Sequence, residues 1–158
     1  MLGGGTGGLV SALIAAGVGA RVALIERART GGDCLWTGCV PSKSLIAAAS
    51  LAHQIRHADT VGLRPVEPEI DFAAVMDHVW SAIRTIEPQD SPERLRAESV
   101  EVIQASGRFT GPGLIDADGR QIAWRSAIIA TGSVVVLVHD AAMVRPAPTR
   151  VLFNYGSG

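Results

Sequence analysis

The sequence has little aromatic content, only two cysteines and a single lysine among fourteen basic residues. Its formal net charge is −1 and it has no run of like charges, which excludes the electrostatic footprint of a nucleic-acid-binding protein or of one held at an anionic membrane. Glycine and alanine are plentiful, and this composition favours a compact α/β domain over a disordered chain. A chain of 158 residues predicts one domain rather than two large ones.

The apolar stretch over residues 9–25 is not expected to cross a membrane. Gly17, Gly19 and Arg21 interrupt it before the roughly 20 apolar residues that a span requires. The eight residues before it contain no basic side chain, which a signal peptide would need. We therefore expect a cytoplasmic protein, in which two neighbouring cysteines indicate redox or metal chemistry rather than a structural disulfide.

A glycine-rich motif stands close to the first residue. Gly3, Gly5 and Gly8 fit the pattern G-x-G-x-x-G, and an alanine-rich helical segment and the strand RVALIE follow. In a dinucleotide-binding βαβ unit, such glycines let the backbone approach a pyrophosphate, and an acid about 20 residues later binds a ribose. Glu26 occupies that position. Only two residues precede the motif, so the strand that normally leads into it is expected to be missing.

Apolar periodicity and turn residues predict the remaining elements. The expected helices cover residues 41–58, 71–87, with Asp71 as its cap, and a short segment opening at 91–92. The expected strands are 100–105, a hairpin over 113–124 turning at 118–119, and a buried strand over 127–132. Two helical stripes are expected to be buried: Leu45, Ala48, Leu51, Ala52 and Ile55 on one helix, and Phe72, Val75, Met76, Val79, Ile83 and Ile86 on the other.

Both cysteines and the lysine lie in one short segment, residues 34–43. Cys34 and Cys39 could bind zinc together with His53 and His57, or could be ordinary buried thiols, or could form a redox pair. In an unbroken helix from residue 41, His53 lies about 18 Å along the axis, too far to share a metal ion with the cysteines. We therefore predict no metal site and favour the redox pair.

The position of Cys39 favours a reactive thiol. It stands at the start of the predicted helix, and Lys43 follows one turn later, so the helix dipole and a cation both stabilise a thiolate there. The intervening loop LWTG contains Gly38, which can bend to let the two cysteines meet. Because arginine serves at every other basic position, Lys43 indicates a site that requires a compact ammonium group, as beside a cofactor ring.

The segment GGDCLWTGCVPSK closely resembles the redox-active disulfide signature of the class I pyridine nucleotide-disulfide oxidoreductases, which include dihydrolipoamide dehydrogenase, mercuric reductase and glutathione reductase. The resemblance covers about residues 3–133 and implies an α/β fold: a Rossmann-like FAD-binding domain with a parallel sheet and a β-hairpin insertion. It assigns the following residues to FAD: Gly3, Gly5 and Gly8 at the pyrophosphate, Glu26 at the adenosine ribose, Thr131 and Gly132 near the ribityl side, and Lys43 near flavin N5.

The resemblance also implies a relay in which NAD(P)H reduces FAD and the flavin reduces a Cys34–Cys39 disulfide. Cys34 would be the interchange thiol that meets a small-molecule disulfide or metal-ion substrate, and Cys39 the charge-transfer thiol against the flavin. The triplet PSK is more similar to the dihydrolipoamide dehydrogenase and mercuric reductase branch. Trp36 and Thr37 depart from the commoner signature, and Asp33 replaces a common threonine. Complete members of the family are expected to be homodimers.

Residues 1–133 are thus expected to form a partial FAD-binding domain, and residues 134–158 a divergent, unassigned tail. His139, in that tail, lacks the surroundings of the family's catalytic base, and we give it no role. We expect an incomplete flavin domain that is inactive alone. The alternative is a standalone dithiol or FAD-binding redox module that does not use nicotinamide.

Overall fold

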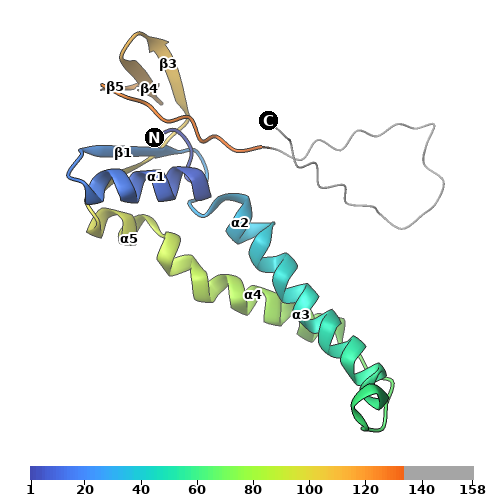
Figure 1. Cartoon of the computed structure of the whole chain (residues 1–158). Helices are drawn as coiled ribbons and strands as arrows, with labels where there is room; N and C mark the ends of the chain where they lie inside the picture. Colours follow the sequence, from blue (N-terminus) through green and yellow to red (C-terminus); the bar gives the residue numbers. More distant parts are fainter. Residues whose placement is uncertain (134–158) are drawn as a thin grey trace, which may run out of the picture.

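The protein folds as an α/β chain with two small sheets and a projecting pair of helices (Figure 1). A computed structural model describes residues 1–133, so the predicted tail and His139 lie outside the described residues. The elements follow in the order α1 (Thr6–Gly17), β1 (Val22–Glu26), α2 (Gly32–Trp36), α3 (Cys39–Arg56), η1 (Ala58–Val61), α4 (Phe72–Ile86), η2 (Glu87–Asp90), α5 (Pro92–Ala97), β2 (Val100–Gln104), β3 (Gly107–Gly111), β4 (Leu114–Ala117) and β5 (Arg120–Ala123).

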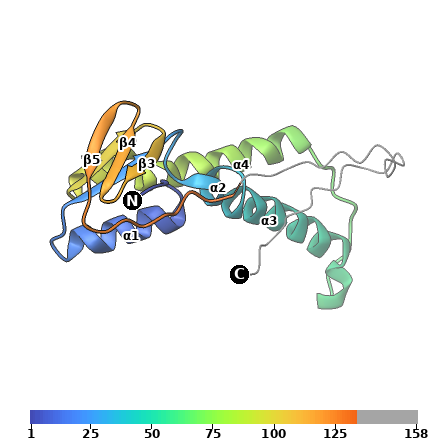
Figure 2. The same ribbon diagram turned by 90° about the horizontal axis from the view of Figure 1, so that it is seen from above.

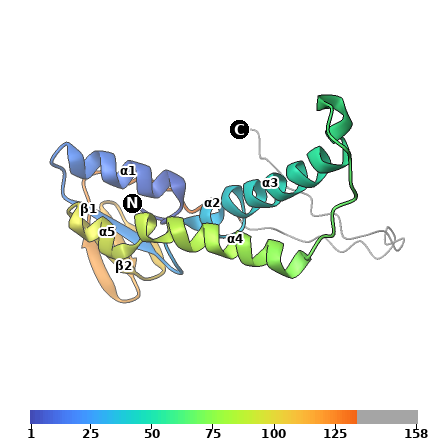
Figure 3. The same cartoon turned by 90° about the horizontal axis from the view of Figure 1, so that it is seen from below.

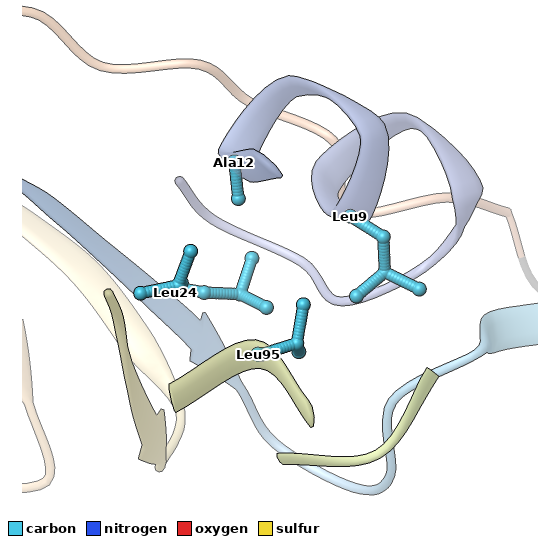
Figure 4. Packing of buried hydrophobic residues seen from close by; sticks show 5 residues of the cluster. Leu9, Ala12, Leu24 and Leu95 are labelled. Atoms are coloured by element: carbon cyan, nitrogen blue, oxygen red, sulfur yellow. The ribbon is translucent and has the colours of Figure 1, made fainter. Parts of the chain in front are cut away.

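The strands β1 and β2 form a parallel pair at the centre of three layers. They pair in register from Val22 with Val100 to Glu26 with Gln104. Side chains alternate between the two faces of a strand, so Leu24 and Ile25 enter different cores. Leu24 packs among α1, α5 and β2, and Figure 4 shows this cluster; Ile25 packs against the antiparallel sheet. The parallel pair is therefore covered by α1 and α5 on one face and by β3, β4 and β5 on the other.

The first residues of the chain lie beside β1, at the place in the sheet where the leading strand is expected. Leu2 forms parallel bridges with Ile25 on one side and with Ile129 on the other. The Gly3 amide donates to the Ile25 carbonyl at 2.8 Å, and the Ala130 amide donates to the Leu2 carbonyl at 2.8 Å. The first three residues therefore join β1 to residues 128–130 and set the glycine motif at the end of the parallel strands.

The expected buried strand over residues 127–132 is wrong. The structure has only the bridge at Ile129 there, and Ile128 and Ile129 are 43% and 66% exposed. A strand needs a partner of comparable length, and the partner here is the short segment around Leu2, which gives way to the glycine loop at once. This segment therefore runs along the edge of the domain as extended chain.

The helices α3 and α4 form a two-helix arm that projects away from the sheets, as Figures 1 and 2 show. Asp71 caps α4 as predicted, because its carboxylate accepts the Ala74 amide at 3.1 Å. Of the apolar stripe predicted for α4, Val79 and Ile83 are buried, and they pack against Leu35 of α2.

The burial predicted for the stripe on α3 is wrong. The helix has no buried residue, and Leu51 is 59% exposed. Amphipathic periodicity shows which side of a helix is apolar, but a single neighbouring helix covers only part of that side. The helix begins at Cys39, which agrees with the predicted place of this cysteine at a helix start, and it ends at Arg56, before the turn that closes at Gly62.

The predicted hairpin is confirmed and belongs to a three-stranded antiparallel sheet, with β4 between β3 and β5. Asp118 and Gly119 both have positive φ, 50° and 90°, as a type I′ turn requires.

The short helix α5 also follows the prediction, with the Ser91 hydroxyl accepting the Arg94 amide at 3.2 Å. Figure 3 shows α5 beside α1 under the parallel pair. Within residues 1–133, no helix is long and apolar enough to cross a membrane.

Candidate redox site

The glycine motif forms a tight turn between the leading segment and α1. Gly3 has a φ of 105°, and a Cβ atom added there would lie 2.1 Å from the Ala130 carbonyl oxygen. A Cβ on Gly8 would lie 1.8 Å from the Gly3 carbonyl oxygen. Gly5 is the N-cap of α1, and no side chain caps this helix start. The first amides of α1 therefore have the arrangement that binds a phosphate or other anion at a helix N-terminus.

The Glu26 carboxylate lies beside this loop. Its Oε2 atom accepts the Gly4 amide at 2.6 Å, and its Oε1 atom accepts the Ala28 amide at 2.8 Å. Each carboxylate oxygen has two lone pairs, so each can accept one further hydrogen bond. The two backbone amides fix the orientation of the carboxylate and leave it able to bind a pair of neighbouring hydroxyls.

Four of the predicted FAD residues line one cavity of about 360 Å³: Gly3, Glu26, Thr131 and Gly132. Ser106 and Gly107, on the turn into β3, also line it. This volume suits the nucleoside part of a dinucleotide. The structure therefore brings together residues from both ends of the described chain, whereas the sequence could connect Thr131 and Gly132 to the site only through the family resemblance.

The two cysteines lie at the junction of α2 and α3, and both are free thiols. Cys34 is half-buried in α2, and Cys39 is exposed at the first position of α3, as predicted. The pKa of Cys34 is raised, mainly by a hydrogen bond with Cys39 and further by burial. This influence of Cys39 on Cys34 indicates that the two side chains lie near each other.

Lys43 is exposed on α3, one turn after Cys39. Its positive charge lowers the pKa of Cys34 and so opposes the rise caused by Cys39 and by burial. Lys43 therefore acts on the thiol in α2, although it lies on the helix that begins at Cys39. The structure thus collects Cys34, Cys39 and Lys43 at one place.

Trp36, between the cysteines, anchors their loop to the segment after β1. Its indole Nε1 donates to the Thr30 carbonyl at 2.8 Å, and the Arg29 guanidinium stacks over its ring at 3.6 Å from the centroid. These three residues and Glu26 line a second cavity of about 300 Å³. The sequence marked Trp36 as a departure from the commoner signature but did not predict this contact.

The carboxylate of Asp33 is exposed and lies near the Thr37 hydroxyl, which donates to its Oδ1 atom at 3.4 Å. Asp33, which stands where threonine is common, thus interacts with Thr37, a residue between the two cysteines.

A zinc site is not formed by the four candidate ligands. Among residues 1–133, no group of three or more histidine, cysteine or acidic side chains could hold a metal ion. His53 and His57 instead stack on each other, with ring centroids 4.1 Å apart near the end of α3.

The fold and this site define a dinucleotide-binding α/β unit that carries a neighbouring pair of thiols. The family model described as pyridine nucleotide-disulphide oxidoreductase matches residues 1–144, and the chain belongs to that family. Enzymes of this family are oxidoreductases that use FAD and NAD(P)H.

Curated relatives support this assignment. The dihydrolipoyl dehydrogenase of Zymomonas mobilis is 33% identical over all of this chain, and that of Chlamydia trachomatis is 36% identical over 84% of it. The chain spans 37% and 29% of the lengths of these two proteins. A solved structure of the HOCl-induced flavoprotein disulfide reductase RclA from Escherichia coli, in a Cu(II) complex, shares the fold. Its TM-score is 0.67 at 23% identity, covering 93% of this chain and 29% of that one.

Proposed function

We propose that residues 1–133 form the FAD-binding and dithiol-bearing part of an FAD-dependent disulfide oxidoreductase similar to dihydrolipoyl dehydrogenase. One observation carries this proposal: the cavity lined by Gly3, Glu26, Thr131 and Gly132 lies in the same small domain as the two free thiols of Cys34 and Cys39, which stand where α2 meets α3. The cavity is suited to a nucleoside, and the thiols are suited to disulfide exchange.

The residues present fit FAD. A helix start without a side-chain cap follows a loop in which Gly3 and Gly8 have no room for a Cβ atom, as a pyrophosphate site needs. We assign Gly3, Gly5 and Gly8 to the pyrophosphate, Glu26 to the ribose hydroxyls, and Thr131 and Gly132 to the remaining wall. Lys43 is assigned to the flavin end because it lies beside the thiols. Bound FAD would supply the electron pair that reduces the disulfide.

The dithiol would then reduce an acceptor disulfide in two exchange steps. The Cys34 thiolate attacks one sulfur of the acceptor, so a mixed disulfide forms and the first acceptor thiolate leaves. The Cys39 thiolate attacks the Cys34 sulfur, which closes the Cys34–Cys39 disulfide and releases the second acceptor thiolate. Cys39, exposed at the first position of α3, is the thiol placed for this second attack, with Lys43 one turn further along the helix.

We further propose that the acceptor of the complete protein is a small-molecule disulfide or a metal ion, with NAD(P)H as the electron source and a homodimer as the working form. The chain spans about a third of the relatives' length. We therefore propose that these 158 residues alone do not catalyse nicotinamide-dependent turnover.

One observation favours the alternative of a standalone redox module. Leu2 bridges β1 and residues 128–130, so the parallel layer is ordered without a full leading strand. Such a module would bind FAD or exchange thiols without nicotinamide.

Replacing Glu26 by glutamine tests the FAD assignment. An amide can accept only through its oxygen, so the side chain loses an acceptor for a ribose hydroxyl, and we expect FAD to bind about tenfold more weakly. Titration with FAD, followed by quenching of flavin fluorescence, measures this change. Glu69→Gln, at an exposed position before α4, is the matched control. Equal affinities for the two variants would remove Glu26 from the site.

A further inference from the structure

The cysteine loop turns back on itself between Cys34 and Cys39. The Gly38 amide donates to the Asp33 carbonyl, and a Cβ atom added to Gly38 would lie 3.6 Å from the Cα atom of Cys34. The residue before Cys39 therefore packs against the backbone of Cys34. The two thiols stay together only if α2, which carries Cys34, keeps its position against α3.

The helix α2 is too short to hold that position by itself. It has five residues, and no side chain caps its start. It lies between the parallel strands and the two-helix arm (Figure 3). Leu35 is buried and packs against Val79 and Ile83 of α4, and Trp36 packs against the same cluster. Apolar packing has no preferred direction, so these contacts alone do not fix how α2 is turned about its axis.

Trp36 supplies a directional contact. Its indole Nε1 donates to the Thr30 carbonyl at 2.8 Å, and the Arg29 guanidinium covers its ring at 3.6 Å from the centroid. Thr30 is buried, and the amide of the next residue, Gly31, donates to the Gly4 carbonyl at 2.9 Å. Trp36 is therefore bound to backbone that is buried and held against the glycine loop.

We propose that Trp36 is a positioning residue for the dithiol: its indole N–H binds the end of α2 to the Thr30 carbonyl and so holds Cys34 beside Cys39. The inference rests on the proposed role of the two thiols in disulfide exchange. Without this hydrogen bond α2 could move in the dithiol form, whereas a closed disulfide would still restrain it. Closure would then cost more conformational freedom, and the effective concentration of one thiol at the other would fall.

Equilibration of the full chain with mixtures of glutathione and glutathione disulfide, without FAD or nicotinamide, tests the proposal. The dithiol gives two electrons and two protons to glutathione disulfide, which leaves as two glutathiones. The ratio of disulfide to dithiol, measured by alkylation of the remaining thiols and mass spectrometry, gives the effective concentration. Trp36→Phe removes the N–H donor and keeps an aromatic ring in the cluster. Trp80→Phe, at an exposed position on α4, is the matched control.

We expect Trp36→Phe to lower the effective concentration about fivefold, the size of effect that one lost hydrogen bond to a buried carbonyl produces. Arg29→Gln, at an exposed position, removes only the cation over the ring and should lower it about twofold. Trp80→Phe should match the parent. Urea unfolding establishes that each chain is folded under the conditions of the exchange.

A parent-like value for Trp36→Phe would overturn the proposal, as would an equal fall in Trp80→Phe. If Trp36→Phe does not fold, Arg29→Gln decides in the same way. A parent chain that forms no internal disulfide would instead contradict the proposed function, so the two failures are distinguishable.

Discussion

Incubation with glutathione disulfide is expected to close an internal Cys34–Cys39 disulfide in the 158-residue chain, while Cys34→Ser and Cys39→Ser each stop at a mixed disulfide with one glutathione. The two free thiols lie near each other where α2 meets α3, so the second thiol can attack as soon as the first has formed a mixed disulfide. A serine hydroxyl cannot carry out that attack, and the loss of disulfide closure is therefore complete.

Mass spectrometry of the intact chain distinguishes these products. The parent should lose two hydrogens and carry no glutathione, whereas each serine variant should gain one glutathione. Ser42→Ala, one position before Lys43 on α3, is the control and should behave as the parent does. A parent chain that accumulates two glutathiones would show that the thiols cannot meet, and the dithiol assignment would then be wrong.

Gly8→Ala is expected to lower the free energy of unfolding by about 3 kcal/mol, the upper part of the range for an overpacked site. The added methyl group would lie 1.8 Å from the Gly3 carbonyl oxygen, and a rotamer change can move neither atom because the backbone fixes both positions. Relief requires α1 to shift away from the loop and from Leu24, which is fully buried against it. The same shift would open the helix start, so FAD should also bind more weakly.

Gly17→Ala provides the matched control on the same helix. No atom lies within 4 Å of a Cβ added at Gly17, and alanine is a better helix former than glycine. This variant should therefore keep or raise the free energy of unfolding, by about 0.5 kcal/mol. Urea unfolding of both variants measures the difference. Similar stabilities for Gly8→Ala and Gly17→Ala would argue against the tight turn described for the glycine loop.

Features encoded within short segments could be predicted from the sequence. Cys39 and Lys43 lie one helical turn apart, so their shared position follows from the helix alone. The cap at Asp71 and the turn at Asp118 and Gly119 also depend on a few neighbouring residues, and each is present in the structure. Glu26 could be connected to the glycine loop because the spacing in a βαβ unit is nearly fixed.

Features that depend on distant pairing could not be predicted. The bridge between Leu2 and Ile129 joins residues more than 100 positions apart, and no local pattern specifies it. The exposure of Leu51 has a similar cause, because periodicity defines an apolar side of α3 but does not show how much of it α4 covers. The contact between Gly5 and Gly32 arises where two glycine-rich turns meet, which the sequence shows only as two separate loops.

The central claim is that one site holds FAD and the dithiol together. Titration of the reduced 158-residue chain with FAD, followed by flavin fluorescence and by long-wavelength absorbance, tests it most directly. The account predicts saturable quenching together with a charge-transfer absorbance that Cys39→Ser abolishes and Cys34→Ser retains. Absence of FAD binding would contradict it. Saturable binding with no charge-transfer absorbance in the parent or in Cys34→Ser would contradict it as well.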